Sequence, residues 1–140
     1  QEANISVVPL GVEPLFRPRS TQDTQDLMAR WNLKHGRYFL TVGTVEPRKN
    51  LQTALDAHAR LPANVRKHFP LVLSGMRGWN SSVLEKRIRA MSKDGTVIPV
   101  GYVSRADLAK LLAGATALVF PSIYEGLACL CLKRCRAACR

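Results

Sequence analysis

The segment TVGTVEPRKN, residues 41–50, places two cations directly after an apolar run. If that run is a buried parallel strand, the segment lies at its carboxyl end, where open α/β sheets bind ligands. Asn50 is a residue type that often begins a helix, so Arg48 and Lys49 would stand beside the free N–H groups of a helix N-terminus. Such an arrangement suits a phosphate. The alternative is a solvated loop with two ordinary surface bases.

A carboxylate candidate follows another apolar run. ALVF (117–120) leads into PSIYEG, which contains Glu125. At a strand end this acid is either a functional carboxylate or a group that makes a structural hydrogen bond. GTVEPRKN is neither a G-x-G-x-x-G motif nor a P-loop, so the sequence predicts neither dinucleotide binding nor Walker-type nucleotide binding.

Four short apolar runs predict strands that would position these residues. They are rich in Val, Leu and Ile and mostly do not alternate with polar residues, as expected of strands buried on both faces of a sheet. An earlier run, ISVV, is a further candidate strand, and an extended connector with several prolines follows it. The runs are RYFLTV (37–42), PLVLS (70–74), TVIPV (96–100), ALVF (117–120) and ISVV (5–8).

Helical patterns lie between the four central runs, so strands and helices alternate. This alternation predicts an α/β fold with a doubly wound parallel sheet. The chain is long enough for one domain with a hydrophobic core. The expected helices are 51–61 capped by Asn50, 82–91 capped by Asn80 or Ser81, a helix that begins at Ser104 and stops at Gly114, and an amphipathic helix within 21–33.

The net charge of +11 would ordinarily suggest nucleic acid as a partner. Its distribution argues otherwise. Lys133, Arg134, Arg136 and Arg140 lie in residues 127–140, which contain no acid, and the other bases are scattered without a dense run or interleaved aromatic residues. We therefore expect no specific binding of nucleic acid.

All four cysteines fall in the same tail, at Cys129, Cys131, Cys135 and Cys139. Residues 1–126 contain no cysteine. This is compatible with a reducing cytoplasm and argues against a disulfide scaffold. Four thiolates could hold zinc, but the spacing lacks the usual paired C-x2-C knuckles. QEANISVVPL is not a signal peptide, and no apolar run reaches the roughly 18 residues of a membrane span. We expect a cytoplasmic protein with no metal and no cofactor.

Three stretches together resemble a known family. ISVVPLGVEPLFRP (5–18), YFLTVGTVEPRKNLQTALDA (38–57) and VGYVSRADLAKLLAGATALVFPSIYEG (100–126) have the order and spacing of the nucleotide-sugar-binding half of retaining, two-domain group 1 glycosyltransferases. The resemblance implies one Rossmann-like half of a double-Rossmann architecture. It divides the chain into a strand and connector on the side of a missing N-terminal domain (1–20), a partial nucleotide-sugar-binding domain incomplete at its C-terminal end (21–126), and a tail (127–140).

The resemblance also implies a donor site. Lys49 matches the lysine that binds the donor diphosphate, next to Gly43 on the same loop. Arg48 is expected to assist, because Thr44 stands where many relatives have an arginine.

Two further segments complete the implied site. Tyr102 and Val103, with Gly101, match the turn beside the nucleotide base. Glu125, followed by Gly126, matches the first glutamate of a paired-glutamate motif that faces the donor sugar, and it is the candidate catalytic residue.

EPRKN is similar to the mannosyltransferases, or related hexosyltransferases, of polysaccharide and glycolipid synthesis. That likeness implies GDP-mannose as the favoured donor, a UDP-sugar as the second choice, and a glycan or lipid-linked acceptor. It implies peripheral membrane association for the full-length relative. Fixed cations would stabilise the departing nucleoside diphosphate without a metal.

The family pattern fails after Gly126. A Gly-Leu-Pro run and a second glutamate, eight residues after the first, should follow, but Lys133 occupies that position. The second glutamate binds the ribose hydroxyls, and lysine cannot accept those hydrogen bonds. Back-translated with permitted codons and read from the third base of the Gly126 codon, the tail becomes F-G-L-P-V-L-E-A-M-P-C-G-V-P, the expected continuation. We hypothesise a single-base frameshift at the Gly126–Leu127 boundary, which resequencing would test.

The sequence thus predicts a fragment of a glycosyltransferase that binds nucleotide weakly. It is expected to lack transferase activity, because it has neither the acceptor domain nor the second glutamate. One alternative is a non-enzymatic basic α/β domain that binds nucleic acid or zinc through its Cys-rich tail. The other is a translated remnant with no function.

Overall fold

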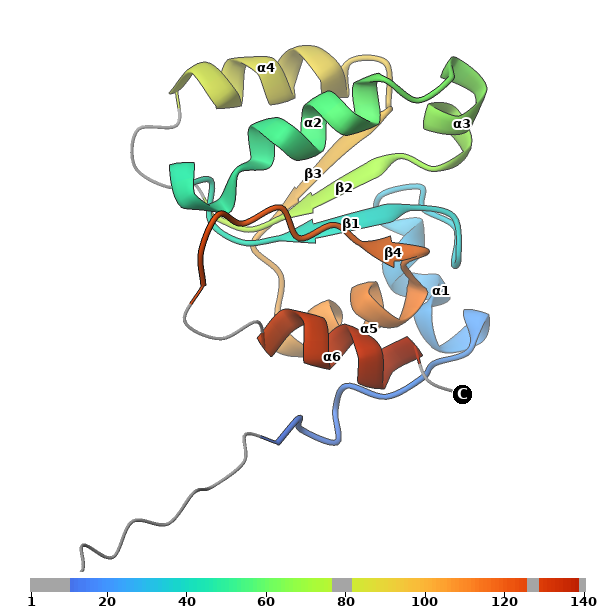
Figure 1. Ribbon diagram of the computed structural model, residues 1–140. Coiled ribbons are helices and arrows are strands. Elements are labelled where there is room, and N and C mark those ends of the chain that lie inside the picture. The colour runs from blue at the N-terminus through green and yellow to red at the C-terminus, as the bar shows by residue number, and fades with distance from the viewer. Residues whose placement is uncertain (1–10, 77–81, 126–128, 139–140) are drawn as a thin grey trace, which may run out of the picture.

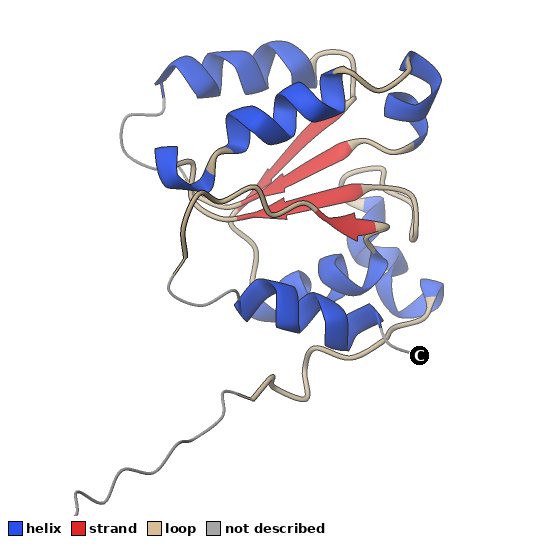
Figure 2. Ribbon diagram, viewed as in Figure 1, coloured by secondary structure: helices blue, strands red, loops and turns tan. Residues whose placement is uncertain are grey.

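The computed structural model describes residues 11–76, 82–125 and 129–138 (Figure 1). Its centre is a four-stranded parallel sheet with helices on both faces (Figure 2). Each strand lies within one residue of its predicted run, which confirms the doubly wound parallel sheet. The strands are β1 Phe39–Val42, β2 Leu71–Ser74, β3 Val97–Gly101 and β4 Ala117–Leu118, in the spatial order β3-β2-β1-β4.

Burial differs between central and edge strands. Every residue of β2 is buried, as the non-alternating pattern predicts. In β3 the burial varies along the strand, so the expectation of burial on both faces is wrong there. The burial varies because β3 lies at the edge of the sheet. An edge strand also tolerates Pro99, since no further strand requires an N–H from this residue.

Helices cover the sheet in two layers. Figure 1 shows α2, α3 and α4 on one face and α1, α5 and α6 on the other. The predicted helices form, whereas the short helix η1, α3 and α6 were not predicted. The ISVV run and the proposed caps Asn80 and Ser81 lie outside the described residues. The helices are α1 Thr21–Ala29, η1 Pro47–Lys49, α2 Leu51–Ala59, α3 Ala63–His68, α4 Ser82–Ser92, α5 Arg105–Gly114 and α6 Cys129–Ala138.

The predicted helix ends have three different outcomes. Ser104 caps α5 as expected, since its hydroxyl accepts from the Asp107 N–H at 3.1 Å. Asn50 precedes α2 but makes no side-chain capping bond, because it has a left-handed backbone (φ 50°) and its Oδ1 accepts from the Thr53 hydroxyl at 2.9 Å instead of from a backbone N–H. Gly114 is the last residue of α5, where a Cβ would lie only 3.0 Å from the Tyr38 hydroxyl. Close packing therefore accounts for this glycine.

Two hydrophobic cores hold the layers together. Alternate strand residues point to opposite faces, so Leu40 and Val72 enter one core while Leu71 and Leu73 enter the other. The first core lies between the sheet and the α1, α5 and α6 layer, and the second lies under α2 and α4. The first contains Phe16, Leu27, Met28, Leu33, Tyr38, Leu40, Val72, Ala109, Leu111, Leu112, Ala115 and Ala137, and the second contains Ala54, Leu55, Leu71, Leu73, Ile88 and Val97.

Backbone hydrogen bonds link the carboxyl ends of β1, β2 and β3. The Gly75 N–H donates to the Gly101 carbonyl at 2.9 Å, and the Gly43 N–H donates to the Ser74 carbonyl at 2.8 Å. A Cβ on Gly75 would lie 1.7 Å from the Gly43 carbonyl oxygen. This contact leaves room for glycine alone, and it fixes the loop after β1 against the loop after β2.

Candidate functional site

A cluster of four charged side chains lies at the carboxyl ends of β1 and β4. Lys49 Nζ forms an ion pair with Glu125 Oε1, and Arg48 Nη1 lies 3.2 Å from Glu125 Oε2. Arg48 Nε donates to Glu46 Oε2 at 2.9 Å. The side chains of Lys49 and Glu125 are only 12% and 16% exposed. The structure thus brings together the predicted phosphate-binding residues and the predicted catalytic residue, and the four charges balance.

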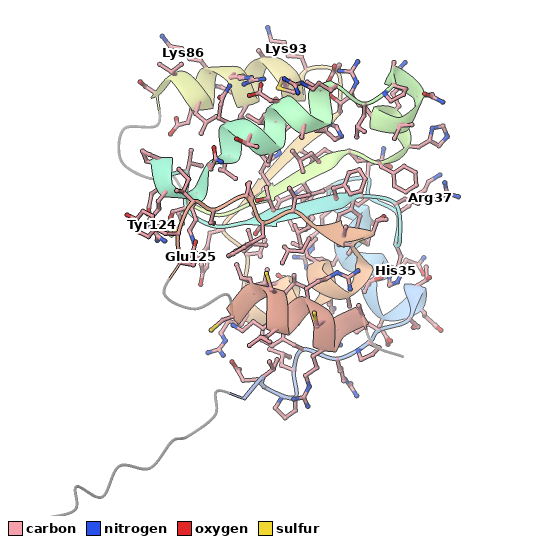
Figure 3. The ribbon with its side chains drawn as sticks, in the orientation of Figure 1. His35, Arg37, Lys86, Lys93, Tyr124 and Glu125 are labelled. Atoms are coloured by element: carbon pink, nitrogen blue, oxygen red, sulfur yellow. The ribbon has the colours of Figure 1, made fainter. Side chains whose placement is uncertain are left out.

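Backbone contacts join the two loops that carry this cluster. The Ile123 N–H donates to the Arg48 carbonyl at 2.9 Å. The Asn50 side-chain Nδ2 donates to the Pro121 carbonyl at 3.2 Å. Figure 3 shows Tyr124 and Glu125 at one end of the sheet, with Arg37 at the opposite end. The loop after β4 is therefore attached to the loop after β1.

Gly43 makes room for the lysine. A Cβ at this residue would lie 3.3 Å from both Cδ and Cε of Lys49. The ammonium group of Lys49 also lies 5.9 Å from the centroid of the Phe120 ring, which faces it from the end of the β4 run. The aliphatic stem of Lys49 therefore crosses the end of β1, and its charge is directed to Glu125.

Glu46 is a site residue that the sequence reasoning missed. Its Oε1 accepts from the Thr44 hydroxyl at 2.5 Å, while its Oε2 accepts from Arg48. The available signal was an acid two residues before the arginine in EPRKN. Thr44 thus contacts the cluster through the Glu46 carboxylate.

The predicted base-binding turn lies after β3. Tyr102 is 73% exposed, whereas Val103 is half-buried against the first core. Gly101 has φ +70°, a left-handed conformation that favours glycine. A mostly apolar cavity of about 310 Å³ is bordered by Gly101, Gly75 and Gly43. This cavity adjoins both the turn and the loop of Lys49, while Gly126 lies outside the described residues.

The cluster lowers the pKa of both carboxyls. Hydrogen bonds from Lys49 and then Ser122 lower the pKa of Glu125, and the charges of Lys49 and Arg48 act in the same direction. The hydrogen bond from Thr44 lowers the pKa of Glu46, and the bond and charge of Arg48 add to this effect. Both carboxylates are therefore ionised at neutral pH.

A pH-dependent stability difference follows for Glu125. Because its pKa is lowered in the folded state, its contribution is present above the ordinary value of 4.5 and is lost as the pH falls through the lowered value. Glu125→Gln is expected to reduce the melting temperature at pH 7, with the difference from wild type shrinking below about pH 4. Thermal unfolding across this pH range measures it. A difference that stays constant with pH would show that the cluster does not hold a charged Glu125.

The tail forms α6 and packs on the first core. Lys133 Nζ lies 4.7 Å from the centroid of the Phe16 ring, and Arg134 donates to the Ala115 carbonyl at 2.8 Å. Cys129 and Cys135 are exposed. Across the part of the chain that the structure describes, no group of three or more His, Cys, Asp or Glu side chains is placed to hold a metal ion. Within the same residues, no helix has the length and apolar character needed to cross a membrane.

The sequence pattern of the family described as "Glycosyl transferases group 1" matches residues 23–135, which include the whole charged cluster. The chain belongs to the group 1 glycosyltransferases. This confirms the family resemblance. The stretches 38–57 and 100–126 lie within the matched residues, the stretch 5–18 lies before them, and the roles of single residues stay predictions.

The group 1 domain has relatives in Escherichia coli. It is 39% identical over 111 residues to O-antigen chain mannosyltransferase B, and this match covers 79% of the chain and 29% of the relative. It is 30% identical over 125 residues to serotype-specific mannosyltransferase WbdA, covering 85% of the chain and 15% of the relative. The chain thus spans less than a third of the length of these relatives.

Solved structures share the fold. WaaG, a glycosyltransferase involved in lipopolysaccharide biosynthesis, superposes with a TM-score of 0.74 at 20% identity, over 94% of this chain and 35% of that one. Anabaena HepE in complex with UDP and glucose gives a TM-score of 0.73 at 17% identity, over 91% of this chain and 34% of that one. At these identities the likeness supports the architecture of the group 1 domain.

Proposed function

We propose that this chain is the donor-binding part of a retaining mannosyltransferase of polysaccharide synthesis, with GDP-mannose as its donor. The observation that supports this most directly is the convergence of Lys49, Arg48 and Glu125 at the carboxyl ends of β1 and β4. The two Escherichia coli relatives are named as mannosyltransferases, which favours mannose as the sugar.

Arg48 and Lys49 bind the diphosphate in this proposal. Departure of a nucleoside diphosphate builds negative charge on its phosphate oxygens, and pre-positioned cations stabilise that charge in the transition state. Both cations are fixed: Lys49 lies across Gly43, and Arg48 is held through its Nε by Glu46. Little reorganisation is then required when the charge develops.

Glu125 faces the sugar when the diphosphate is bound. In the structure its carboxylate lies between the two cations and pairs with both. A diphosphate that takes over these contacts leaves the carboxylate beside the group attached to the phosphates, which is the sugar. The base then lies toward the turn of Tyr102, whose exposed ring offers a surface for stacking.

Lys133 weakens this proposed binding. At the position where the family has its second glutamate, this chain presents a lysine whose ammonium lies on the Phe16 ring. The ribose hydroxyls therefore lack a carboxylate partner from this residue. We expect nucleotide binding that is measurable but weak.

Calorimetric titration with GDP, UDP and ADP, at low and moderate salt, tests the proposal. GDP is expected to bind, and the Arg48→Ala/Lys49→Ala double variant is expected to lose at least about 100-fold in affinity, because two charge-assisted contacts are removed. The matched control is Lys86→Ala/Lys93→Ala, which removes one exposed cation from α4 and one from the turn directly after it (Figure 3). Equal losses in both double variants would indicate non-specific attraction, and binding of none of the nucleotides would contradict the proposal.

A further inference from the structure

Two carboxylates contact the same guanidinium, but they are attached to the protein in different ways. Glu46 uses both oxygens within its own loop: Oε1 accepts from Thr44 at 2.5 Å and Oε2 accepts from Arg48 Nε at 2.9 Å. Glu125 instead reaches Arg48 and Lys49 from the loop after β4. One carboxylate is thus internal to the cation-bearing loop, and the other comes from a different segment.

Backbone hydrogen bonds within the loop hold the segment that contains Glu46. The Glu46 N–H donates to the Thr44 carbonyl at 2.9 Å, and the Lys49 N–H donates to the Glu46 carbonyl at 3.0 Å. Withdrawing the Glu46 carboxylate would leave the Thr44 hydroxyl and Arg48 Nε without these partners. Its side chain is only 19% exposed, so water does not readily replace them.

The segment that carries Glu125 is joined to the loop after β1 by the Ile123 N–H, but the side chains of Ile123 and Tyr124 are less buried than that of Glu46. These two residues, directly before Glu125, are 71% and 68% exposed and bury little apolar surface. The carboxylate is held mainly by side-chain contacts, to Lys49 and Arg48 among others. An anion that offers the same two cations more negative charge is able to replace these contacts.

We infer that Glu46 is a positioning residue that, with Thr44, directs Arg48 toward the diphosphate, whereas Glu125 occupies the phosphate position and is displaced by the donor. This inference rests on the proposed function. The guanidinium has a fixed fork of donors, so a partner at Nε determines where the terminal nitrogens point. Arg48 Nη1 now contacts Glu125, and a phosphate oxygen takes that contact in the bound state.

Two chemically equivalent substitutions test the inference, because they should have opposite effects. Glu46→Gln is expected to weaken GDP binding about tenfold through loss of a charge-assisted hydrogen bond to Arg48. Glu125→Gln is expected to strengthen it about threefold or more, because the competing carboxylate becomes neutral. If charge alone mattered, both variants would bind GDP more tightly, since each removes one negative charge from the same cluster.

A matched control separates this effect from a general loss of stability. Asp56→Asn also removes an acid that pairs with an arginine, since Arg87 Nη2 lies 2.6 Å from Asp56 Oδ1, away from the charged cluster. Its GDP affinity is expected to equal that of wild type. Thr44→Val, which removes the hydroxyl donor to Glu46, should weaken GDP binding like Glu46→Gln, and Thr44→Ser should bind GDP more tightly than Thr44→Val. Thermal unfolding of each variant monitors the fold.

NMR spectroscopy can also test directly whether the Arg48 side chain is held in position. Its Nε–H is expected to give a slowly exchanging NMR signal in the unliganded wild type and in Glu125→Gln, and to lose that protection in Glu46→Gln and Thr44→Val. Wild-type GDP binding combined with unchanged or tighter binding by Glu46→Gln would overturn the positioning role. Unchanged or weaker binding by Glu125→Gln would overturn the displacement. Failure of the wild type to bind any nucleotide would instead overturn the proposed function.

Discussion

Replacing Gly75 by alanine is expected to destabilise the domain by about 3 kcal/mol or more, which lowers the melting temperature by roughly 10 °C. A Cβ at this residue would lie 1.7 Å from the Gly43 carbonyl oxygen, and the obstacle is backbone rather than a flexible side chain. Relief therefore requires the ends of β1 and β2 to separate. Thermal or urea unfolding of the purified variant measures the loss.

Two other glycines provide the controls. Gly95 has φ +73° but open space around its Cα, so Gly95→Ala should cost only the backbone strain, about 1 kcal/mol. Gly11 has neither a left-handed backbone nor a neighbour within 4 Å of an added Cβ, and Gly11→Ala should leave the melting temperature unchanged. If Gly75→Ala lost no more stability than Gly95→Ala, the two strand ends would not be held in the contact described above.

The same contact connects the fold to the charged cluster. Gly43 lies between Gly75 on one side and the stem of Lys49 on the other, so a displacement of one strand end moves the lysine. A Gly75→Ala variant that still folds should therefore also bind nucleotide less well. The glycine-lined ends of the strands are thus a structural requirement for placing the cation.

The parts of this fold that could be predicted are those that periodicity encodes. A strand buried on both faces must be apolar throughout, and β2 is. The short helix α3 escaped prediction because its six residues, ANVRKH, include no buried side chain and therefore no apolar stripe. In α6, apolar and basic residues with good helix propensity were interpreted as an out-of-frame tail. Composition alone did not show that Ala137 would be buried against the first core.

The charged cluster was likewise predictable from the sequence only in part. Arg48, Lys49 and Glu125 were found because each belongs to a recognisable segment at the end of an expected strand. Glu46 was missed because its role depends on side-chain geometry within one loop, which no spacing rule describes. Asn50 was assigned a capping role because capping propensity is local. Its Oδ1 instead accepts from the Thr53 hydroxyl, and its Nδ2 donates to the Pro121 carbonyl, which is distant in sequence.

Replacing residues 127–140 by the shifted reading FGLPVLEAMPCGVP is expected to tighten GDP binding at least about tenfold. The substituted tail places a glutamate where Lys133 now stands, and a carboxylate can accept hydrogen bonds from both ribose hydroxyls, each bond being charge-assisted. Calorimetric titration of the wild type and the tail variant under identical salt conditions measures the gain.

Two controls identify the source of that gain. The same replacement tail with glutamine in place of its glutamate keeps the new segment but removes the charge, and it should recover only part of the affinity. Lys133→Glu in the original tail places a carboxylate against the Phe16 ring, where a cation now lies, and it should not improve binding. If this single substitution matched the full replacement, the frame of the tail would not matter for the donor site. If the replacement tail gave no gain, Lys133 would not stand where a ribose-binding glutamate belongs, and the frameshift hypothesis would lose its functional support.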